Sequence, residues 1–472
     1  MTQHNQVTDQ VKRLVPWLVA VAFFMEALDT TILNTAVPTM ADALHVAPLS
    51  MKAVLTSYTI SLAVFIPVSG WVADRFGTRR VFSSAIGLFT FGSLMCGISV
   101  NIHMLVACRI LQGCGGAMMV PVGRLTVVRT FDKSELIRAM SFVAIPGLIG
   151  PMLGPLAGGL IVGYLQWRVI FFVNLPIGLI GLYMVLRKLP DFRVEHSDPL
   201  DVVGLILFGS GIALLSYVLE VFGETSLTTL EIVGLLAIAA SLLFGYYSHA
   251  RTEKRPLLHL GLFRLRTFAC AITGGFVTRL GSGGMPFLLP LLYQVGLGYS
   301  AVQSGLLIMP QPLAAMSLKL TMPKILARFG FRRVLLTNTL LMGMLMMLFA
   351  TVGLRTPVAL IVAQAFAYGF VSSLQFTSMN TLVYSDVPNH DTSQASTMAS
   401  TGQQMALSFG VATASLAAAL FIPDRVKASA AGMVHGTHEA FIVLGALTTL
   451  SSVVFFMLKT SDGANVSLHA DA

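Results

Sequence analysis

The feature that most constrains this chain is a series of apolar runs, each about 20 residues long, along nearly its whole length. An α-helix of that length crosses roughly 30 Å of hydrocarbon. Of the 472 residues, 55% are hydrophobic and 11% are charged, whereas soluble globular proteins have about 25% charged residues. The polar stretches 187–201 and 251–266 are too short to bury a core of their own. We therefore predict an all-α membrane protein.

Runs bounded by charged or turn residues predict fourteen transmembrane helices. The expected spans are residues 14–37, 53–73, 81–100, 104–128, 138–163, 167–187, 201–222, 229–249, 267–293, 301–322, 334–353, 357–381, 394–421 and 438–458. Short cytoplasmic loops retain Lys and Arg, and with the N-terminus inside they hold 21 of the 30 such residues. Both termini are therefore expected in the cytoplasm. The net charge of +9 reflects this topology, and basic residues scattered among short loops do not indicate nucleic-acid binding.

Two loops share a motif. Residues 73–80 read ADRFGTRR and residues 326–333 read LARFGFRR, with five of eight positions identical. Each copy joins the second and third spans of a six-span block if spans seven and eight form an insertion. Parallel repeats of this kind are a transporter arrangement, with the substrate site near mid-membrane between the halves. We expect a 6+2+6 layout: an N-terminal six-helix half (1–190), a two-helix insertion with its connecting loops (191–266), and a C-terminal six-helix half with a short tail (267–472).

Four charged residues are expected well inside spans: Glu26, Asp29, Arg109 and Arg279. Each would cost at least ~2.5 kcal/mol at a lipid-facing helix centre, so they should face the interior and have partners. A helical rise of ~1.5 Å per residue puts Asp29 and Arg109 at similar heights, and Glu26 shares a helix face with Asp29. A carboxyl group between an acid and a base can change its proton affinity when helices move. Glu26, Asp29 and Arg109 are therefore candidate proton-coupling residues; the alternative is an Asp29–Arg109 ion pair that only holds two spans in register.

Several polar residues in the spans are candidates for a substrate cavity. They are Asn34, Gln112, Arg279, Gln403 and Gln404. Arg279 could be a counter-ion, a substrate contact or an arginine satisfied by helix carbonyls, and the glutamines could instead bond between helices. The 24 Met and 30 Phe residues supply adaptable apolar surface. No span carries paired His and carboxylate ligands or an activated nucleophile, so neither a metal site nor an enzyme is predicted.

The fifth expected span is dense in glycine and proline. Its Gly150, Gly154, Pro155, Gly158 and Gly159 let helices approach closely and bend within a membrane. This pattern predicts a tightly packed contact helix. Ordinary small-residue packing without a gating role is the alternative.

Several motifs occur in order on the expected spans. They are Leu28-Asp29-x-Thr31-x-x-Asn34-x-Ala36-x-Pro38, the loop from Gly70 to Arg80, Arg109-x-x-Gln112-Gly113, Gly150-x-x-x-Gly154-Pro155-x-x-Gly158-Gly159, and Trp167-Arg168-x-x-Phe171-x-x-Asn174-x-Pro176. With them the whole chain resembles the major facilitator superfamily, in particular its fourteen-span drug:proton antiporter branch. Two positions depart from the pattern: Ser141 replaces an expected glycine, and Ala327 replaces Asp74 in the second loop copy.

The resemblance implies roles for particular residues. It assigns proton coupling to Asp29 and Arg109, whereas Glu26 is inferred from its depth alone. It also implies a cytoplasmic gating loop that opens and closes during alternating access. The residues of that loop are Gly70, Asp74, Arg75, Gly77, Arg79 and Arg80.

Together these features predict a secondary active transporter of the bacterial inner membrane that exports small amphipathic or drug-like compounds by proton antiport. A proton-coupled symporter that imports a specific solute is the alternative, because fold does not fix function. No cofactor is expected, since the proton gradient supplies the energy. The expected partners are a small-molecule substrate, protons and membrane lipid; we expect a monomer, and an accessory periplasmic partner stays open. The two acids of the first span favour cationic substrates.

Overall fold

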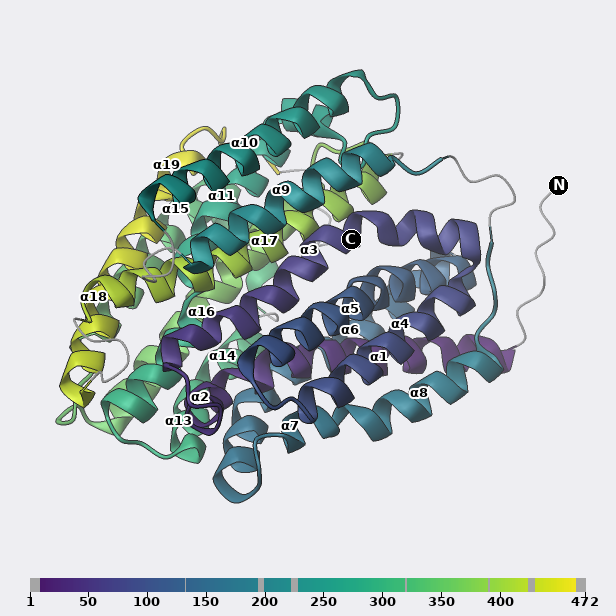
Figure 1. Ribbon diagram of the computed structural model, residues 1–472. Helices are drawn as coiled ribbons and strands as arrows, with labels where there is room; N and C mark the ends of the chain where they lie inside the picture. The colour runs from purple at the N-terminus through teal and green to yellow at the C-terminus, as the bar shows by residue number, and fades with distance from the viewer. Residues whose placement is uncertain are drawn as a thin grey trace.

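The computed structural model describes residues 9–131, 133–193, 199–221, 228–318, 321–388, 391–422 and 429–463, and every regular element in those ranges is helical. Ten helical segments within them are long and apolar enough to cross a membrane. Figure 1 shows two helical bundles side by side, with one further pair of helices lying along them. The structure therefore confirms the predicted all-α class.

The N-terminal bundle follows the order of its predicted spans. Its elements are α1 (Asp9–Ile32), η1 (Asn34–Ala36), α2 (Val37–Ala43), η2 (Pro48–Met51), α3 (Lys52–Phe76), α4 (Thr78–Gly97), α5 (Ile102–Thr130), α6 (Lys133–Tyr164), α7 (Val169–Phe172) and α8 (Asn174–Lys188). α1 packs on α6, α3 on α5, and α4 on α5 and α8. Tyr58, Phe82 and Phe89 are fully buried in this bundle.

The helix pair α9 (Val202–Val221) and α10 (Thr229–Thr252) follows. The two pack on each other, and α9 also packs on α3 and α17, so it lies along the seam between the bundles (Figure 1). Asp201 fixes this pair at one end. Its carboxylate accepts hydrogen bonds from Gly204 N (2.7 Å) and Leu257 N (3.0 Å) and lies 2.7 Å from His249 Nε2.

The C-terminal bundle contains more interrupted helices. Its elements are η3 (Leu260–Arg264), α11 (Arg266–Ser282), α12 (Met285–Pro290), the π-helical η4 (Leu291–Gly296), α13 (Ala301–Ile308), α14 (Pro310–Leu318), α15 (Met322–Leu348), η5 (Phe349–Thr351), α16 (Val358–Leu382), α17 (Thr392–Leu420), α18 (Ala430–Leu450) and α19 (Ser452–Phe455). α11 packs on α17 and α18, and α14 on α16.

Four of the fourteen expected spans are not among the ten long apolar helices. They correspond to α6, to α11 with α12 and η4, to α13 with α14, and to α17. α6 is one continuous helix with Pro146, Pro151 and Pro155 inside it. The next two are broken at Gly283–Gly284 and before Pro310, as is tolerated where neighbouring helices satisfy the backbone, and α17 is rich in Ser, Thr and Gln. The element order is consistent with fourteen spans as 6+2+6. The span count, the domain boundaries and the side of the termini stay predictions.

The repeated loop motif has the same backbone form in both copies. Gly77 has a φ of 92° between α3 and α4, and Gly330 has a φ of 72° at a kink inside α15. Side-chain-bearing residues rarely adopt such positive φ values, which explains a glycine at both positions. The shared turn supports the internal repeat inferred from the sequence.

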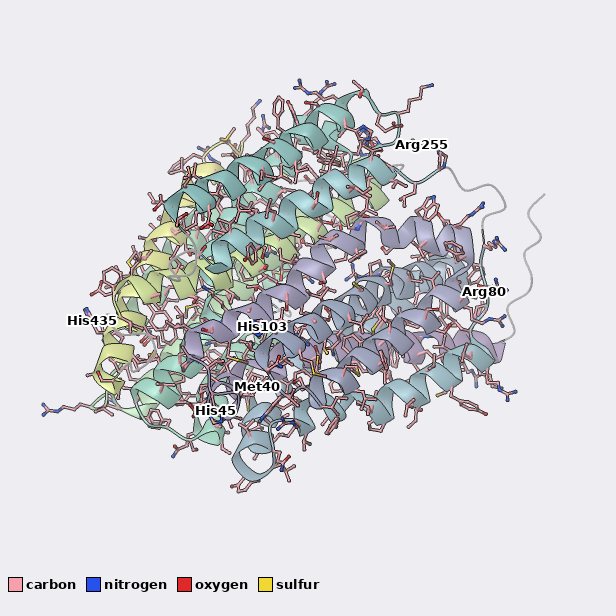
Figure 2. The ribbon with its side chains drawn as sticks, in the orientation of Figure 1. Met40, His45, Arg80, His103, Arg255 and His435 are labelled. Carbon is pink, nitrogen blue, oxygen red and sulfur yellow. The ribbon has the colours of Figure 1, made fainter. Side chains whose placement is uncertain are left out.

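The two bundles meet at the end that the distribution of Lys and Arg places outside the cell. Gln294 Nε2 donates to Thr35 O (2.8 Å), and Ser415 Oγ donates to Leu49 O (3.4 Å). Figure 2 shows Arg80 and Arg255 at the opposite end from His45 and His435. Near that basic end Gly70 is exposed, and a Cβ built on it would meet no atom within 4 Å. These contacts between the halves lie at the end opposite the basic loops, and α3 is uncovered at Gly70 near the basic end.

Candidate proton and substrate sites

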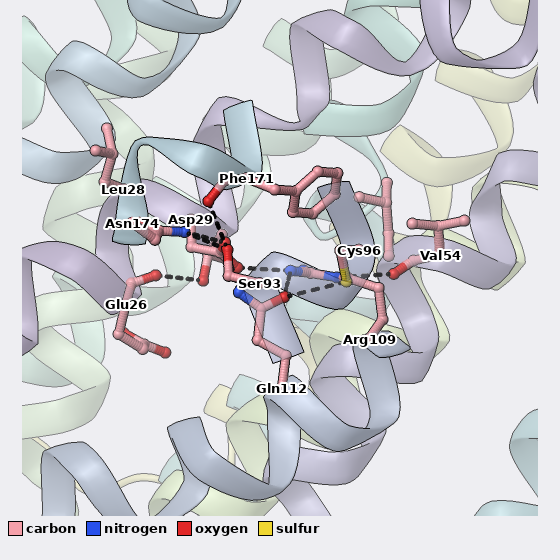
Figure 3. A network of polar contacts seen from close by, with 12 residues as sticks. Glu26, Leu28, Asp29, Val54, Ser93, Cys96, Arg109, Gln112, Phe171 and Asn174 are labelled. Atoms are coloured by element: carbon pink, nitrogen blue, oxygen red, sulfur yellow. Dashed lines mark hydrogen bonds and ion pairs between the residues drawn. The ribbon is translucent and has the colours of Figure 1, made fainter. Parts of the chain in front are cut away.

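Asp29 is the centre of a buried polar network in the N-terminal bundle (Figure 3). Arg109 Nη1 donates to Asp29 Oδ2 at 2.6 Å, and the two side chains are 1% and 0% exposed. Gln112 Nε2 and Asn174 Nδ2 each donate to Asp29 Oδ1 at 2.9 Å. The carboxylate therefore accepts three hydrogen bonds from α5 and α8. This confirms the predicted proximity of Asp29 and Arg109.

The network continues around both charged groups. Arg109 Nη1 also donates to Gln112 Oε1 at 2.8 Å, and the guanidinium carbon lies 4.2 Å from the centre of the Tyr58 ring. Asn174 donates to Ser93 Oγ at 3.1 Å. Satisfied polar contacts of this kind offset the cost of removing a charge pair from water. Asp29 therefore joins α1 to α5 and α8 through its hydrogen bonds.

Glu26 lies one helical turn before Asp29 in a different environment. Its side chain is partly exposed, and no hydrogen bond or ion pair joins its carboxylate to another residue in the described part of the chain. In Figure 3 this carboxylate points away from the Asp29 network. The two acids of α1 thus differ: Asp29 is held by hydrogen bonds in a buried network, and Glu26 lies outside that network.

The predicted gating loop joins α3 and α4. Arg129 Nη2 donates to Asp74 Oδ1 at 2.5 Å, which ties the ends of α3 and α5. The backbone N–H of Arg79 donates to Asp191 Oδ1 at 3.0 Å. Arg75 and Arg80 are exposed, as is Gly70, whereas Gly77 forms the turn itself. The contact of Asp74 lies within the N-terminal half, and that of Arg79 joins this half to the start of the following loop.

The glycines of α6 face the first helix. Cβ atoms built on Gly154 and Gly158 would overlap Thr31 and the carbonyl oxygen of Ile32, and Thr35 Oγ1 donates to Pro155 O at 3.2 Å. A Cβ built on Gly150 would likewise lie only 2.8 Å from Ala27 Cβ. A Cβ on Gly159 would lie 2.5 Å from the carbonyl oxygen of Ala301, in the opposite half. α6 is therefore the close-contact helix that the sequence predicts, and it touches both α1 and α13.

A second polar site lies in the C-terminal bundle, where a pocket opens between α11, α16 and α17. Arg279 lines it, is 7% exposed, and donates to Asn380 Oδ1 (3.4 Å) and Gln403 Oε1 (3.3 Å). Its guanidinium carbon lies 4.6 Å from the centre of the Phe376 ring, and Nη1 donates to Gly275 O at 3.3 Å. The structure brings together Arg279 and Gln403, two of the five predicted cavity residues.

The other three predicted cavity residues lie elsewhere. Gln112 is fully buried in the N-terminal bundle and hydrogen-bonds to Asp29, so it does not line this pocket. Asn34 belongs to the turn η1 at the outer end, and Gln404 is partly exposed on α17 but does not line the pocket.

Sequence reasoning missed several partners. Asn174 stood in a quoted motif without a role, although an asparagine in an apolar run was the available signal. The sequence around Asp191 and Asn380 did not indicate a role for either residue. Their hydrogen bonds are to Arg79 and Arg279, which lie 112 and 101 residues away in the sequence.

Comparisons with known proteins agree with this geometry. The family model described as Major Facilitator Superfamily matches residues 19–411. The chain is 39% identical over 452 residues, 96% of both chains, to proteins named "Putative multidrug resistance protein MdtD" from Escherichia fergusonii and Shigella flexneri serotype 5b. Two solved structures share the fold with a TM-score of 0.68. One is a POT family transporter (15% identity; 95% of each chain covered), and the other is a D-xylose-proton symporter (14% identity; 95% of this chain and 98% of that chain).

Proposed function

Because the chain belongs to the Major Facilitator Superfamily, we propose that this membrane transporter exports small amphipathic compounds in exchange for protons, by alternating access. Its place among multi-span transporters agrees with the predicted bacterial inner membrane and with the prediction that the chain is not an enzyme. The relatives named for multidrug resistance support an exporter of drug-like compounds.

The observation that carries the proposal is the Asp29 network. A carboxylate that is 0% exposed and hydrogen-bonded to Arg109, Gln112 and Asn174 can take up a proton only if the partners separate. Protonation would remove its attraction to Arg109, so α1 and α5 would no longer be held together at this point. Proton binding and helix movement are thus linked at Asp29.

Glu26 complements Asp29 in this scheme. Its side chain is half-buried and lies on the same helix face, one turn toward the basic end of α1, and it makes no hydrogen bond or ion pair among the described residues. A proton that leaves Asp29 can pass to Glu26 and from there to cytoplasmic water. We assign Glu26 to proton relay and Asp29 to coupling, and no cofactor is required because the proton gradient drives the cycle.

In this proposal the loop between α3 and α4 and the helix α6 take part in the conformational change of alternating access. Asp74 and Arg129 tie α3 to α5, so the cytoplasmic end of α3 moves with its own half. α6 packs closely on α1 and reaches α13, so a movement of α1 is transmitted to the interface between the halves.

Proton flux in vesicles of known orientation tests the proposal. Purified protein is reconstituted with a pH dye inside, and lipophilic cations, anions and neutral compounds are added in turn. Proton movement opposite to the compound is expected. Movement in the same direction would identify a symporter and overturn the export assignment.

A further inference from the structure

The cation of Arg279 has no acidic partner in its own bundle. The helices around it, α11, α16 and α17, contain no Asp or Glu in the sequence. Among the described residues no carboxylate forms an ion pair with it, and its hydrogen bonds go to neutral oxygens of Gly275, Asn380 and Gln403. By contrast, Arg109, which is also buried, forms an ion pair with Asp29. Burying a charge without a counter-ion is energetically costly, so an anion that bound beside Arg279 would be stabilised.

The guanidinium also lies where a ligand can reach it. Arg279 lines the pocket between α11, α16 and α17, and Asn380 at the same pocket is exposed. Gly275 leaves room for the folded-back side chain, since a Cβ there would lie 2.9 Å from Arg279 Nη1. The long hydrogen bonds, 3.3–3.4 Å, hold the guanidinium loosely. A carboxylate could replace them with two shorter, charge-assisted bonds.

The rest of the pocket is apolar. Phe276, Met379 and Val383 line it, and Phe376 stacks beside the guanidinium. The free space inside the pocket is small, about 10 Å³, so a carboxylate would enter it while the flat or aliphatic body of a small organic molecule packs on the apolar side chains around its opening.

We propose that Arg279, Asn380 and Gln403 bind the carboxylate of an amphipathic organic acid whose apolar body packs on Phe276 and Met379. The site defines the substrate class of the proposed transporter and to that extent rests on the proposed function. It replaces the cationic preference drawn from the two span-one acids, because one of those acids is already neutralised by Arg109. Asn380 and Gln403 position the guanidinium and donate to the bound carboxylate from their amide groups.

Three ligands with one ring system test the site: 1-naphthoate, 1-naphthylmethanol and 1-naphthylmethylammonium. Binding to the purified full-length protein is measured by titration calorimetry, with protein-free micelles as the blank. The wild type should bind naphthoate about tenfold or more tightly than the other two ligands. Arg279→Gln should abolish that preference, and Arg355→Gln, the same change at an exposed outer residue, should retain it. Equal binding of the three ligands, no naphthoate binding, or an unaffected Arg279→Gln variant would each overturn the proposal.

A second variant tests the site even if Arg279→Gln does not fold. Asn380→Asp puts a carboxylate beside the guanidinium with almost no change in shape. It should raise the melting temperature while weakening naphthoate binding about tenfold, since the built-in anion competes with the ligand. Unchanged naphthoate affinity in Asn380→Asp would refute the site.

The vesicle assay separates this proposal from the proposed antiport. Naphthoate binding that depends on Arg279, without proton movement in the opposite direction, would contradict proton antiport but support the carboxylate site. Opposing proton movement with the ammonium compound but not with naphthoate would support antiport and reject the carboxylate site.

Discussion

Asp29 and Arg109 each depend on the other at the scale of single residues. Both are almost completely buried, and the other bonds of Asp29 come from neutral amides. Breaking such a pair by removing one partner leaves an uncompensated charge. The sequence predicted this pairing because both residues are charged, lie within spans and have comparable depth. It did not predict that Gln112 and Asn174 donate to Asp29, because depth does not reveal which way a neutral side chain points.

Removing the arginine should therefore cost more than removing both charges. Arg109→Ala should lower stability by ~3–5 kcal/mol, because Asp29 stays buried without its cation. The double variant Asp29→Asn, Arg109→Gln should recover most of that loss, since both buried groups are then neutral. Thermal unfolding in detergent provides the measurement. A wild-type melting temperature in Arg109→Ala would mean that the arginine lies at a wet, peripheral position.

At the scale of elements, α6 combines close packing with bends. The sequence predicted its role because glycines recur on one face, and the structure shows that this face lies against α1. The breaks at Gly283–Gly284 and before Pro310 lay inside runs that we expected to be continuous. Hydropathy cannot locate such breaks, because they depend on which neighbouring groups satisfy the free backbone.

Two alanine substitutions compare a close and a loose contact of α6 with α1. Gly158→Ala should destabilise the protein by roughly 1–3 kcal/mol and slow transport, because its Cβ would overlap the Ile32 carbonyl oxygen and separate α1 from α6. Gly147→Ala makes the same chemical change where the nearest atom, Phe23 Cβ, is 4.0 Å away, so it should be tolerated. Melting temperatures and transport rates of the pair check this. Equal effects would show that the two helices can separate without cost.

The contacts of Asp201 that hold α9, α10 and the following loop together should depend on pH. Burial raises the pKa of Asp201, but hydrogen bonds from Gly204 N–H, His249 and Leu257 N–H outweigh it and leave the pKa below its usual value. A lowered pKa stabilises the folded state above the unfolded value of about 3.9, and that stabilisation is lost as the pH falls through the folded pKa.

Asp201→Asn should consequently melt below the wild type at pH 7, and the difference should shrink once the pH drops below about 4. Asp42→Asn changes an exposed acid on α2 and serves as the control. A gap for Asp201→Asn that stays constant across this range would show that the carboxylate charge does not hold the pair.

At the scale of the whole molecule, two halves meet at the outer end and differ in their buried charges. Among the described residues, Arg109 in the N-terminal half pairs with Asp29, whereas Arg279 in the C-terminal half hydrogen-bonds to neutral oxygens. The sequence predicted the two halves from one repeated loop, whose glycines share a positive φ. It could not predict which side is closed, because that depends on side-chain contacts between halves that alternate during a transport cycle.

The central claim is that Asp29 couples protons to transport rather than only holding two helices in register. The most direct measurement compares two activities of Asp29→Asn in vesicles: accumulation driven by a pH gradient, and exchange of labelled for unlabelled substrate without a gradient. The account predicts that accumulation is lost while exchange persists, since exchange needs binding and alternation but no net proton movement. Accumulation that persists in Asp29→Asn, or loss of both activities together, would contradict it.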